Sequence, residues 1–436
     1  MYDLAVIGLG PAGLEAVSIA LKNNLKVIAF EREEVGGTCL NVGCIPTKTI
    51  LHTSQLIREI NNASNVGISL FSAPDFSWQK ILDRKTEIVN KFTKILNSQL
   101  SKNITLIKAE VQLNIDYDEV ELIANNEIYK AKNVIIATGS TPVELPGLPF
   151  DGNFVINSDD FYRMQTLPRK ITIVGSGAIG LEWAKILSDL NVEVKLIEKA
   201  PAIAPLLDIE LQKRAERILK AQNVEYFKND YIAKISNNLV ILGSETAFET
   251  DCILVAIGRK PVLPKTTMGN FGEYNITPDE YGFTDFENLF VAGDAGGYSM
   301  LAHNASYQAR CIMNKILFDK QIIRKAIPSV IYTMPEIASI GVREQDIQGL
   351  EGYKVKKILI PSIAKSWCDD CADGLVKAIL FEDKIVGAHV VSKDASSLIS
   401  IFSVFIDRQI SIYDIQDMIF PHPSYAEAIL EMLKDE

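Results

Sequence analysis

Short apolar runs alternate with glycine turns and amphipathic stretches along most of the chain, which is the pattern of an α/β protein. One unit of this pattern occurs twice. In the first copy, an apolar strand at residues 4–7 leads through a glycine-rich turn into a helical stretch over residues 14–22 and a second strand over residues 25–30. In the second copy, the strands cover residues 171–174 and 192–197. The repeat predicts two nucleotide-binding βαβ units.

Three further apolar runs end in glycine turns, at residues 134–137, 253–257 and 289–292. Strands that end in this way lie at the ligand-binding edge of α/β sheets. Residues 77–100 have the spacing of an amphipathic helix. Beyond Ala326 the glycine fingerprints stop, and β-rich runs are followed by helical ones. We therefore expect an α/β protein with two Rossmann-like nucleotide-binding domains, one inserted in the other, and a third, C-terminal α+β domain.

Composition limits the function classes. The chain has 436 residues, which is enough for two or three domains. Its content of 47% hydrophobic and 23% charged residues is typical of a globular protein. The formal net charge is −11 and the basic residues form no stripe, so nucleic acid is not an expected partner. No apolar stretch reaches membrane-spanning length, and no leader pattern precedes the first strand. We expect no membrane partner, and a cytoplasmic protein or a mature organelle form.

Each glycine turn has the form G-x-G-x-x-G, follows a strand, opens a helix and is followed by an acid after the next strand. The first two glycines allow the backbone to approach a pyrophosphate at the helix N-terminus. The acids, Glu31 and Glu198, stand at the same distance from their turns and would each bind a ribose diol. A carboxylate at Glu198 favours NAD over NADP, although Lys195 and Lys199 weaken that preference. Two structural units with empty turns are the disfavoured alternative.

Cys39 and Cys44 form a C-x4-C pair just before a predicted helix that has Pro46 in its first turn. A thiolate at a helix N-terminus near a lysine, here Lys48, has a lowered pKa. Gly43 allows the chain to bend enough for a disulfide. The pattern favours a redox pair over two buried structural cysteines.

The remaining cysteines and one histidine are weaker signals. Cys252 and Cys311 lie in apolar or helical runs, as inert core thiols do. Cys368 and Cys371 form a C-x2-C pair without the further ligands that a metal site needs, so a solvent-facing loop pair is favoured over a metal or relay site and no metal is expected. His422 could serve as an acid/base near neutral pH, although a lone histidine is more often structural.

Together these residues carry a resemblance to a family. The chain resembles the class I pyridine nucleotide-disulfide oxidoreductases and, among them, is most similar to the dihydrolipoamide dehydrogenases. The match runs nearly end to end, and its most specific part is the redox motif at residues 36–48. It continues through the turns at residues 258–259, 292–294 and 301–303 to His422-Pro423. Ser424 and Tyr425 depart from the usual Thr and Leu, which leaves the substrate open.

The resemblance implies a role for each matching residue. Cys39 would meet the substrate and Cys44 would contact the flavin as a thiolate, while Lys48 would pair with Glu182 near the flavin. His422, oriented by Glu427, would act on the thiols of the other subunit of a homodimer. The implied FAD-binding residues are Gly8, Gly10, Gly13, Glu31, Thr38, Lys48, Gly139, Asp294 and Ala302. The implied NAD-binding residues are Gly175, Gly177, Gly180, Glu198 and Gly258.

The resemblance also implies domain limits and an activity. The FAD-binding domain would cover residues 1–145 and 265–325, the NAD-binding domain 146–264 and the dimerisation domain 326–436. The expected reaction is the oxidation of dihydrolipoyl groups by NAD+, on the lipoyl carrier domain of a 2-oxoacid dehydrogenase or glycine-cleavage complex. Open alternatives are an NAD(P)H-dependent reductase of another small, glutathione-like disulfide, and a redox-inactive flavoprotein that serves as a binding subunit.

Overall fold

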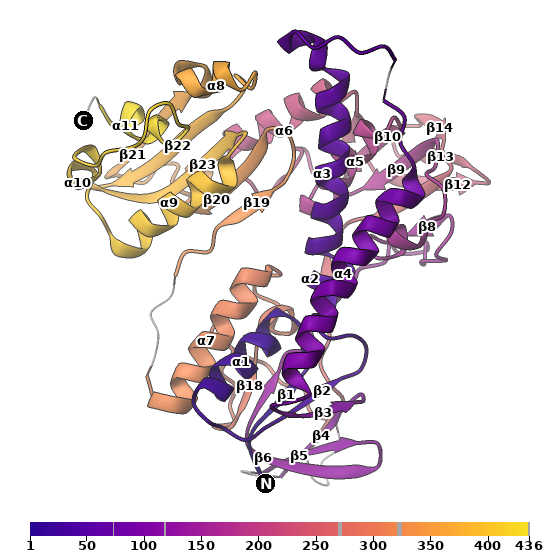
Figure 1. Cartoon of the computed structure of the whole chain (residues 1–436), viewed down its shortest axis with the longest axis vertical. Coiled ribbons are helices and arrows are strands. Elements are labelled where there is room, and N and C mark those ends of the chain that lie inside the picture. Colours follow the sequence, from indigo (N-terminus) through magenta and orange to yellow (C-terminus); the bar gives the residue numbers. More distant parts are fainter. Residues whose placement is uncertain (73, 117–118, 269–272, 321–324, 435–436) are drawn as a thin grey trace.

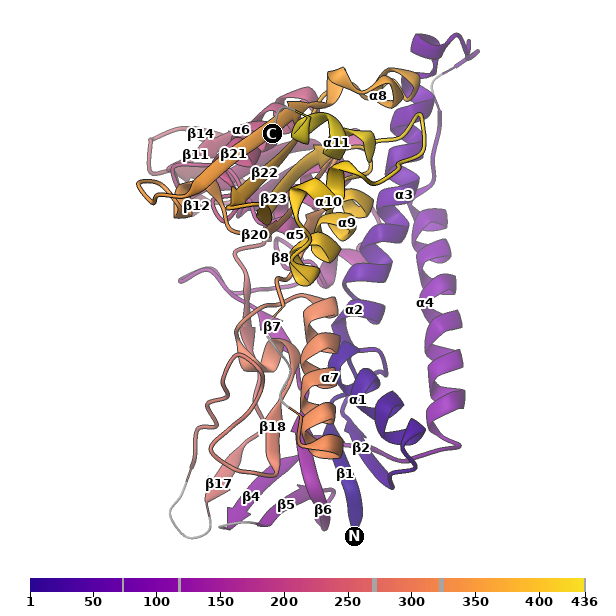
Figure 2. The same cartoon turned by 90° about the vertical axis from the view of Figure 1, so that its left-hand side faces the viewer.

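The computed structural model describes residues 1–72, 74–116, 119–268, 273–320 and 325–434. Its mixed α/β architecture confirms the expected fold class. Figures 1 and 2 show the first nucleotide-binding unit at one end of the molecule and the second unit and the C-terminal unit together at the other. Helices α3 (Cys44–Asn61) and α4 (Trp78–Leu100) run lengthwise between the two ends. The redox motif at the start of α3 therefore lies where the units meet.

The first unit is built around strand β1 (Tyr2–Ile7), which is buried on both faces. Leu4 and Val6 pack into one hydrophobic core, whereas Ala5 and Ile7 pack into another, as the alternation of side chains along a strand requires. This is the burial expected for a parallel sheet covered on both sides. The parallel strands around β1 are β2 (Val27–Glu31), β3 (Thr105–Lys108), β6 (Glu127–Ile136) and β18 (Leu289–Val291).

Additional strands extend this sheet and helices cover it. The strands β4 (Gln112–Asp116), β5 (Glu119–Ala124) and β17 (Thr266–Met268) continue the sheet beyond β6. Helix α7 (Ala302–Phe318) packs against α1 (Pro11–Lys22) in the core on one face. The predicted start of α1 at residue 14 was wrong, because Pro11 is tolerated at the first helical position, where no backbone N–H is needed.

The second unit is a parallel sheet inserted into the first. β18 pairs with β6 although the whole second unit lies between them in sequence. The chain leaves and re-enters the first unit through an antiparallel ribbon of β7 (Ser140–Pro142) and β16 (Arg259–Pro261). In sheet order, the inserted strands are β11 (Glu225–Lys228), β10 (Glu193–Glu198), β9 (Lys170–Val174), β15 (Cys252–Val255) and β8 (Val155–Ile156). Helices α5 (Ala178–Asp189) and α6 (Ile209–Ala221) belong to this unit, as does a small sheet of β12 (Ile232–Ser236), β13 (Leu239–Leu242) and β14 (Ala247–Glu249).

The C-terminal unit is an antiparallel sheet packed against helices (Figure 1). Its strands, in sheet order, are β19 (Ser329–Ile331), β20 (Glu336–Gly341), β23 (Lys384–Ser392), β22 (Leu375–Phe381) and β21 (Tyr353–Leu359). The helices that share its core are α9 (Ala395–Arg408), α10 (Ile412–Gln416) and α11 (Glu427–Leu433).

Buried charges join the C-terminal unit to the second unit. Lys377 Nζ lies 2.7 Å from Asp208 Oδ1, and both side chains are fully buried. Glu344 also contacts Lys377, and His389 Nε2 lies 3.7 Å from Asp208 Oδ2. Because a buried charge is costly without its partner, these contacts oppose separation of the two units.

None of the helices within the described ranges combines the length and apolar character that crossing a membrane requires.

Candidate active site

Cys39 and Cys44 are brought together where two helices meet. Cys39 lies in α2 (Gly37–Asn41), and Cys44 is the first residue of α3. Both are half-buried free thiols. Gly43 lies between the helices, and a Cβ there would stand 2.8 Å from the carbonyl oxygen of Thr38. Only glycine therefore permits this close approach of α2 and α3.

The two thiols differ in acidity. The pKa of Cys44 is lowered to about 7, chiefly because the Cys39 thiol donates a hydrogen bond to it. Burial opposes this shift, and the positive charge of Lys48 adds to it. The pKa of Cys39 is raised by the same hydrogen bond and by burial. Near neutral pH the reduced pair therefore holds its negative charge on Cys44.

Lys48 and Glu182 form an ion pair one helical turn beyond Cys44. Lys48 Nζ lies 2.8 Å and 3.0 Å from the two carboxylate oxygens of Glu182, whose side chain is buried. The backbone N–H of Tyr332 also donates to Glu182, at 3.1 Å, and the Tyr332 ring lies 4.6 Å from Lys48 Nζ. Each of the three units thus contributes to this pair. Tyr332 has no sequence motif that could have predicted its position.

A second unpredicted tyrosine holds the first turn of α3. The Tyr162 hydroxyl lies 2.5 Å from Thr47 Oγ1, and Thr47 donates to the Gly43 carbonyl at the same distance. Tyr162 belongs to a 3₁₀ turn of the second unit at Asp160–Arg163, and burial raises its pKa, so its hydroxyl stays protonated. The residues next to Cys44 are therefore fixed by a hydrogen bond from another unit.

The two glycine turns have matching geometry. Gly8 and Gly175 both have positive φ, +94° and +104°. A Cβ at Gly8 would lie 2.4 Å from the Ala137 carbonyl oxygen, and one at Gly175 would lie 2.5 Å from that of Ala256. Glycine is therefore required at both positions, because any side chain would prevent the turn from packing closely against the end of the neighbouring strand.

The acids that follow the turns also match. Glu31 Oε2 accepts the N–H of Leu9 at 2.8 Å, and Glu198 Oε2 accepts the N–H of Ser176 at 2.9 Å. The second oxygen of each carboxylate accepts a backbone N–H two residues further along the chain. Each acid therefore holds its own turn in place, in addition to the ribose contact predicted for it.

The turns fit dinucleotide cofactors. Gly10 and Gly177 are the N-caps of α1 and α5, and neither helix start has a side-chain cap. The first N–H groups of both helices can therefore bind phosphate. A Cβ at Gly177 would meet no atom within 4 Å, which leaves room for a ligand.

The other predicted cofactor residues lie around the same turns. Asp294 follows β18, and its carboxylate accepts a hydrogen bond from Ser140 at 2.6 Å. Ala302 is the first residue of α7. Gly139 and Gly258 follow strands of the two sheets, and a Cβ at either would meet no atom within 4 Å.

His422 and Glu427 pair with each other at a distance from the thiols. His422 Nδ1 lies 2.8 Å from Glu427 Oε1, while the N–H of Ser424 donates to Oε2 at 2.7 Å. These two bonds lower the pKa of Glu427. The imidazole is exposed, and the two views agree that α11 lies well away from α2 (Figures 1 and 2). Within one subunit, the pair is not brought to Cys39 and Cys44.

The other cysteines divide into two kinds. Cys252 and Cys311 are buried, which confirms their prediction as core thiols. The prediction that Cys368 and Cys371 both lie in a solvent-facing loop was wrong in part. Cys368 is exposed but ends a short helix, α8 (Ala364–Cys368), and Cys371 is half-buried beyond it.

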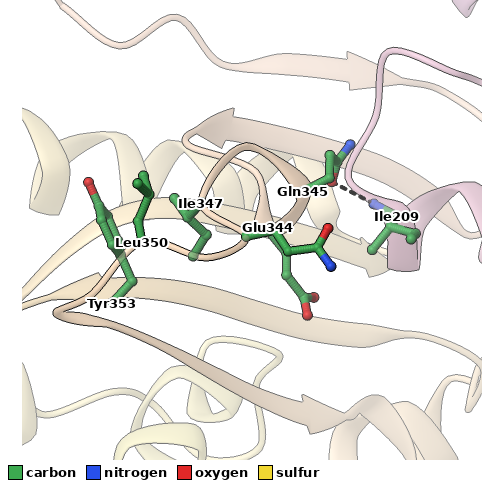
Figure 3. Close-up of a pocket in the computed structure, with 7 residues that line it drawn as sticks. Ile209, Glu344, Gln345, Ile347, Leu350 and Tyr353 are labelled. Carbon is green, nitrogen blue, oxygen red and sulfur yellow. Dashed lines mark hydrogen bonds between the residues drawn. The ribbon is translucent and has the colours of Figure 1, made fainter.

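A pocket opens away from all of these residues, where α6 meets the loop after β20. Figure 3 shows its lining and the hydrogen bond from Ile209 N to Gln345 Oε1, which measures 3.1 Å. None of the predicted site residues lines it. Its lining residues are Ile209, Glu344, Gln345, Ile347, Gln348, Leu350 and Tyr353.

Known proteins match the chain along most of its length. Residues 2–309 match the family model described as pyridine nucleotide-disulphide oxidoreductase, and residues 327–433 match its dimerisation domain. The chain is 32% identical to dihydrolipoyl dehydrogenase of Mycoplasma pneumoniae, over 99% of the chain and 98% of the relative. It is 31% identical to leghemoglobin reductase of Glycine max, over 98% and 86%.

Solved structures show the same fold. LpdA from Mycobacterium tuberculosis matches with a TM-score of 0.89 at 24% identity, over 99% of both chains. The flavoprotein disulfide reductase RclA from Escherichia coli matches with a TM-score of 0.84 at 23% identity, over 99% of both chains.

Proposed function

The chain belongs to the pyridine nucleotide-disulphide oxidoreductase family, and from this premise we propose that it is a dihydrolipoyl dehydrogenase that oxidises protein-bound dihydrolipoamide with NAD+. The observation that carries the proposal is the acidity difference within the Cys39–Cys44 pair beside the Lys48–Glu182 ion pair. Full-length similarity to curated dihydrolipoyl dehydrogenases supports the choice of substrate.

Enzymes of this family use FAD and NAD(H). We assign FAD to the first unit, with its phosphates at the start of α1 near Gly10, and NAD to the second unit at the start of α5 near Gly177. When bound, the flavin supplies two-electron transfer between the thiols and the nicotinamide. The residues of the chain position these groups and control where protons reside.

The thiol steps follow from the different acidities of the two cysteines. In the oxidised enzyme, a substrate thiolate attacks the Cys39 sulfur, and the Cys39–Cys44 bond breaks. Cys44 leaves as a thiolate, which the positive charge of Lys48 stabilises, and the hydrogen bond from Cys39 adds to this once Cys39 is again a free thiol. The second substrate thiol then attacks the mixed disulfide, which releases the cyclic disulfide and leaves Cys39 protonated.

Each attack needs a group that takes the proton of the substrate thiol. We assign this role to His422, whose Nδ1 is held by Glu427 and whose other ring nitrogen stays available. Because the pair lies away from the thiols of its own subunit, it would act on those of the partner subunit in a two-fold dimer. The match to the dimerisation domain supports the homodimer.

The partner in the cell would be a lipoyl carrier domain of a 2-oxoacid dehydrogenase or glycine-cleavage complex. The net charge of −11 suits a basic binding segment in such a complex. A reductase of a glutathione-like disulfide is the second candidate, and the carboxylate of Glu198 counts against its usual coenzyme, NADPH.

Steady-state kinetics on the purified flavin-loaded protein test the proposal. NAD+ reduction by dihydrolipoamide is measured beside NADPH oxidation by oxidised glutathione, with Cys44→Ser as the inactive control. Fast dihydrolipoamide turnover that Cys44→Ser abolishes would support the proposal. Glutathione turnover without dihydrolipoamide turnover would replace it with the second candidate.

A further inference from the structure

A second cysteine pair lies at the end of α8. Cys368 is the last residue of this helix, and the chain then turns through Asp370, whose φ is +49°. The N–H of Cys371 donates to the Ser366 carbonyl at 2.9 Å, and the N–H of Asp370 donates to the Trp367 carbonyl at 3.3 Å. These two bonds make a helix-ending turn of the Schellman type. Both cysteines therefore belong to one ordered turn, three residues apart.

The two thiols of this turn are chemically unequal. Cys368 is exposed, whereas Cys371 is half-buried. Burial raises the pKa of Cys371, and the nearby Lys393 only partly offsets this. In dithiol exchange an accessible sulfur reacts with the substrate first, and a shielded second sulfur displaces it. The neighbouring Trp367, whose ring nitrogen bonds the Pro361 carbonyl, is 67% exposed and offers an apolar surface beside Cys368.

The pair adjoins the segment that carries the His422–Glu427 couple. Tyr425, which lies between those two residues in sequence, is only 5% exposed. Its pKa is raised by burial first and then by the nearby Cys371 and Asp369. Within the described residues, its buried hydroxyl has no hydrogen-bond partner of normal geometry. Figures 1 and 2 agree in placing α8 beside α11.

Thiol chemistry fits this site better than metal binding. A structural zinc site uses four ligands, and the turn supplies two sulfurs. Among the residues whose placement the structure gives, no three His, Cys, Asp or Glu side chains are arranged to hold a metal ion.

We propose that Cys368 and Cys371 are a second site of thiol–disulfide exchange, which takes a small disulfide as its oxidant. Cys368, as the thiolate, attacks one sulfur of the disulfide, whose S–S bond breaks and releases one thiol after protonation. Cys371 loses its proton and attacks the Cys368 sulfur, which releases the second thiol and leaves a Cys368–Cys371 disulfide. Two electrons pass to the external disulfide.

A dithiol returns these electrons. It is either the reduced Cys39–Cys44 pair of the enzyme or an external dithiol of the substrate class. The exchange reaction itself needs only the turn, whereas the first source of electrons rests on the proposed function.

Trapping with oxidised glutathione tests the site on the flavin-loaded protein. In Cys371→Ser the second step is blocked, so mass spectrometry of peptides should find glutathione on Cys368 at least about tenfold more often than in the unmodified sequence. The unmodified protein should instead yield the Cys368–Cys371 disulfide. The buried Cys252 should carry no adduct in either protein. Equal glutathione on Cys368 in both proteins, or none in either, would overturn the proposal.

A second measurement identifies the reductant. Protein that carries the Cys368–Cys371 disulfide is treated anaerobically with NADH and, separately, with dithiothreitol. Both treatments are applied to the unmodified protein and to the Cys44→Ser variant. Reduction by NADH that depends on Cys44 assigns the electrons to the redox pair of the enzyme, and reduction by dithiothreitol alone assigns them to an external dithiol. Reduction by neither contradicts an exchange site. Trapping without dihydrolipoamide turnover would count against the proposed function alone.

Discussion

The charge on Cys44 depends on few neighbours, which makes it testable one residue at a time. The hydrogen bond from Cys39 is the largest cause of its lowered pKa, and the nearby Lys48 is the main positive charge. A depressed thiol pKa means that the thiolate is present above about pH 7 and is protonated below it. Activity that uses this thiolate should follow the same pH dependence.

Replacing Lys48 tests how far its positive charge lowers the pKa of Cys44. In Lys48→Met the thiolate loses a nearby positive charge, so the Cys44 titration should move to higher pH by about one pH unit. The measurement is the pH dependence of the thiolate–flavin absorption band of the reduced enzyme. Lys80→Met, on the exposed side of α4, is the control and should leave the midpoint in place. An unchanged midpoint in Lys48→Met would contradict a contribution of Lys48 to the lowered pKa of Cys44.

Glu198 offers a test of coenzyme preference. Its carboxylate is held by Ser176 and by the N–H of Ala200, so the negative charge stands fixed beside the second glycine turn. Glu198→Gln should change the ratio of kcat/KM for NADH and NADPH by about tenfold in favour of NADPH, as the loss of roughly 1–2 kcal/mol of repulsion predicts. Glu193→Gln, on the exposed part of the same strand, is the control. A constant ratio would show that Glu198 only holds the turn.

At the scale of elements, a polar seam joins α3 to α5. Lys48 meets Glu182 at one end, and further along the same helices Arg58 Nη1 lies 3.2 Å from Asp189 Oδ1. Lys185, which is fully buried, lies 2.7 Å from the other oxygen of Asp189. The seam fixes α3, which begins at Cys44, against the second unit over several helical turns.

Removing Asp189 should be the most damaging change in this seam. Asp189→Asn leaves the buried Lys185 without a counter-charge, which should lower the free energy of unfolding by about 3–5 kcal/mol. Lys185→Met should cost less, because Arg58 still pairs with Asp189. Urea unfolding of the two variants and of the double variant measures the coupling between them. Asp319→Asn, in an exposed lysine–aspartate pair of the same spacing, is the control and should change stability little. Equal costs for Asp189→Asn and Asp319→Asn would contradict a stabilising seam.

Local rules explain which elements the sequence could predict. The glycine turns and the Ser77-capped helix α4 obey constraints that act within a few residues, and each was predicted close to its observed position. Tyr162 and Tyr332 are different, because their contacts to Thr47 and Glu182 cross 115 and 150 residues of sequence. Long-range packing places them, and neither stands in a recognisable motif.

Lys185 and Asp189 show a further limit of sequence reasoning. An i,i+4 pair of opposite charge is typical of a solvated helix face, yet both side chains are buried. Ser54 and Arg58 of α3 contact this pair, and the whole fold sets the position of α3.

At the scale of the whole molecule, the question is which subunit completes the site. Mixing inactive subunits answers it. A dimer of one Cys44→Ser subunit and one His422→Ala subunit would contain one site with both groups intact, if His422 acts across the interface. Random exchange in a two-fold dimer makes half of the dimers mixed, so about one quarter of the original activity should return. The measurement is dihydrolipoamide turnover after the two variants are unfolded and refolded together.

The subunit-mixing experiment has two controls and one outcome that would contradict action across the interface. Each variant refolded alone should stay inactive. A mixture of Cys44→Ser with Cys39→Ser should also recover no activity, because each subunit of the mixed dimer then lacks one cysteine of its own pair. If His422 acted within its own subunit, every site of the mixed dimer would lack one group, and activity would not return. Return of activity would thus establish that the distance between α11 and α2 within one subunit is closed by the partner subunit, and that two copies of the chain are needed for one working site.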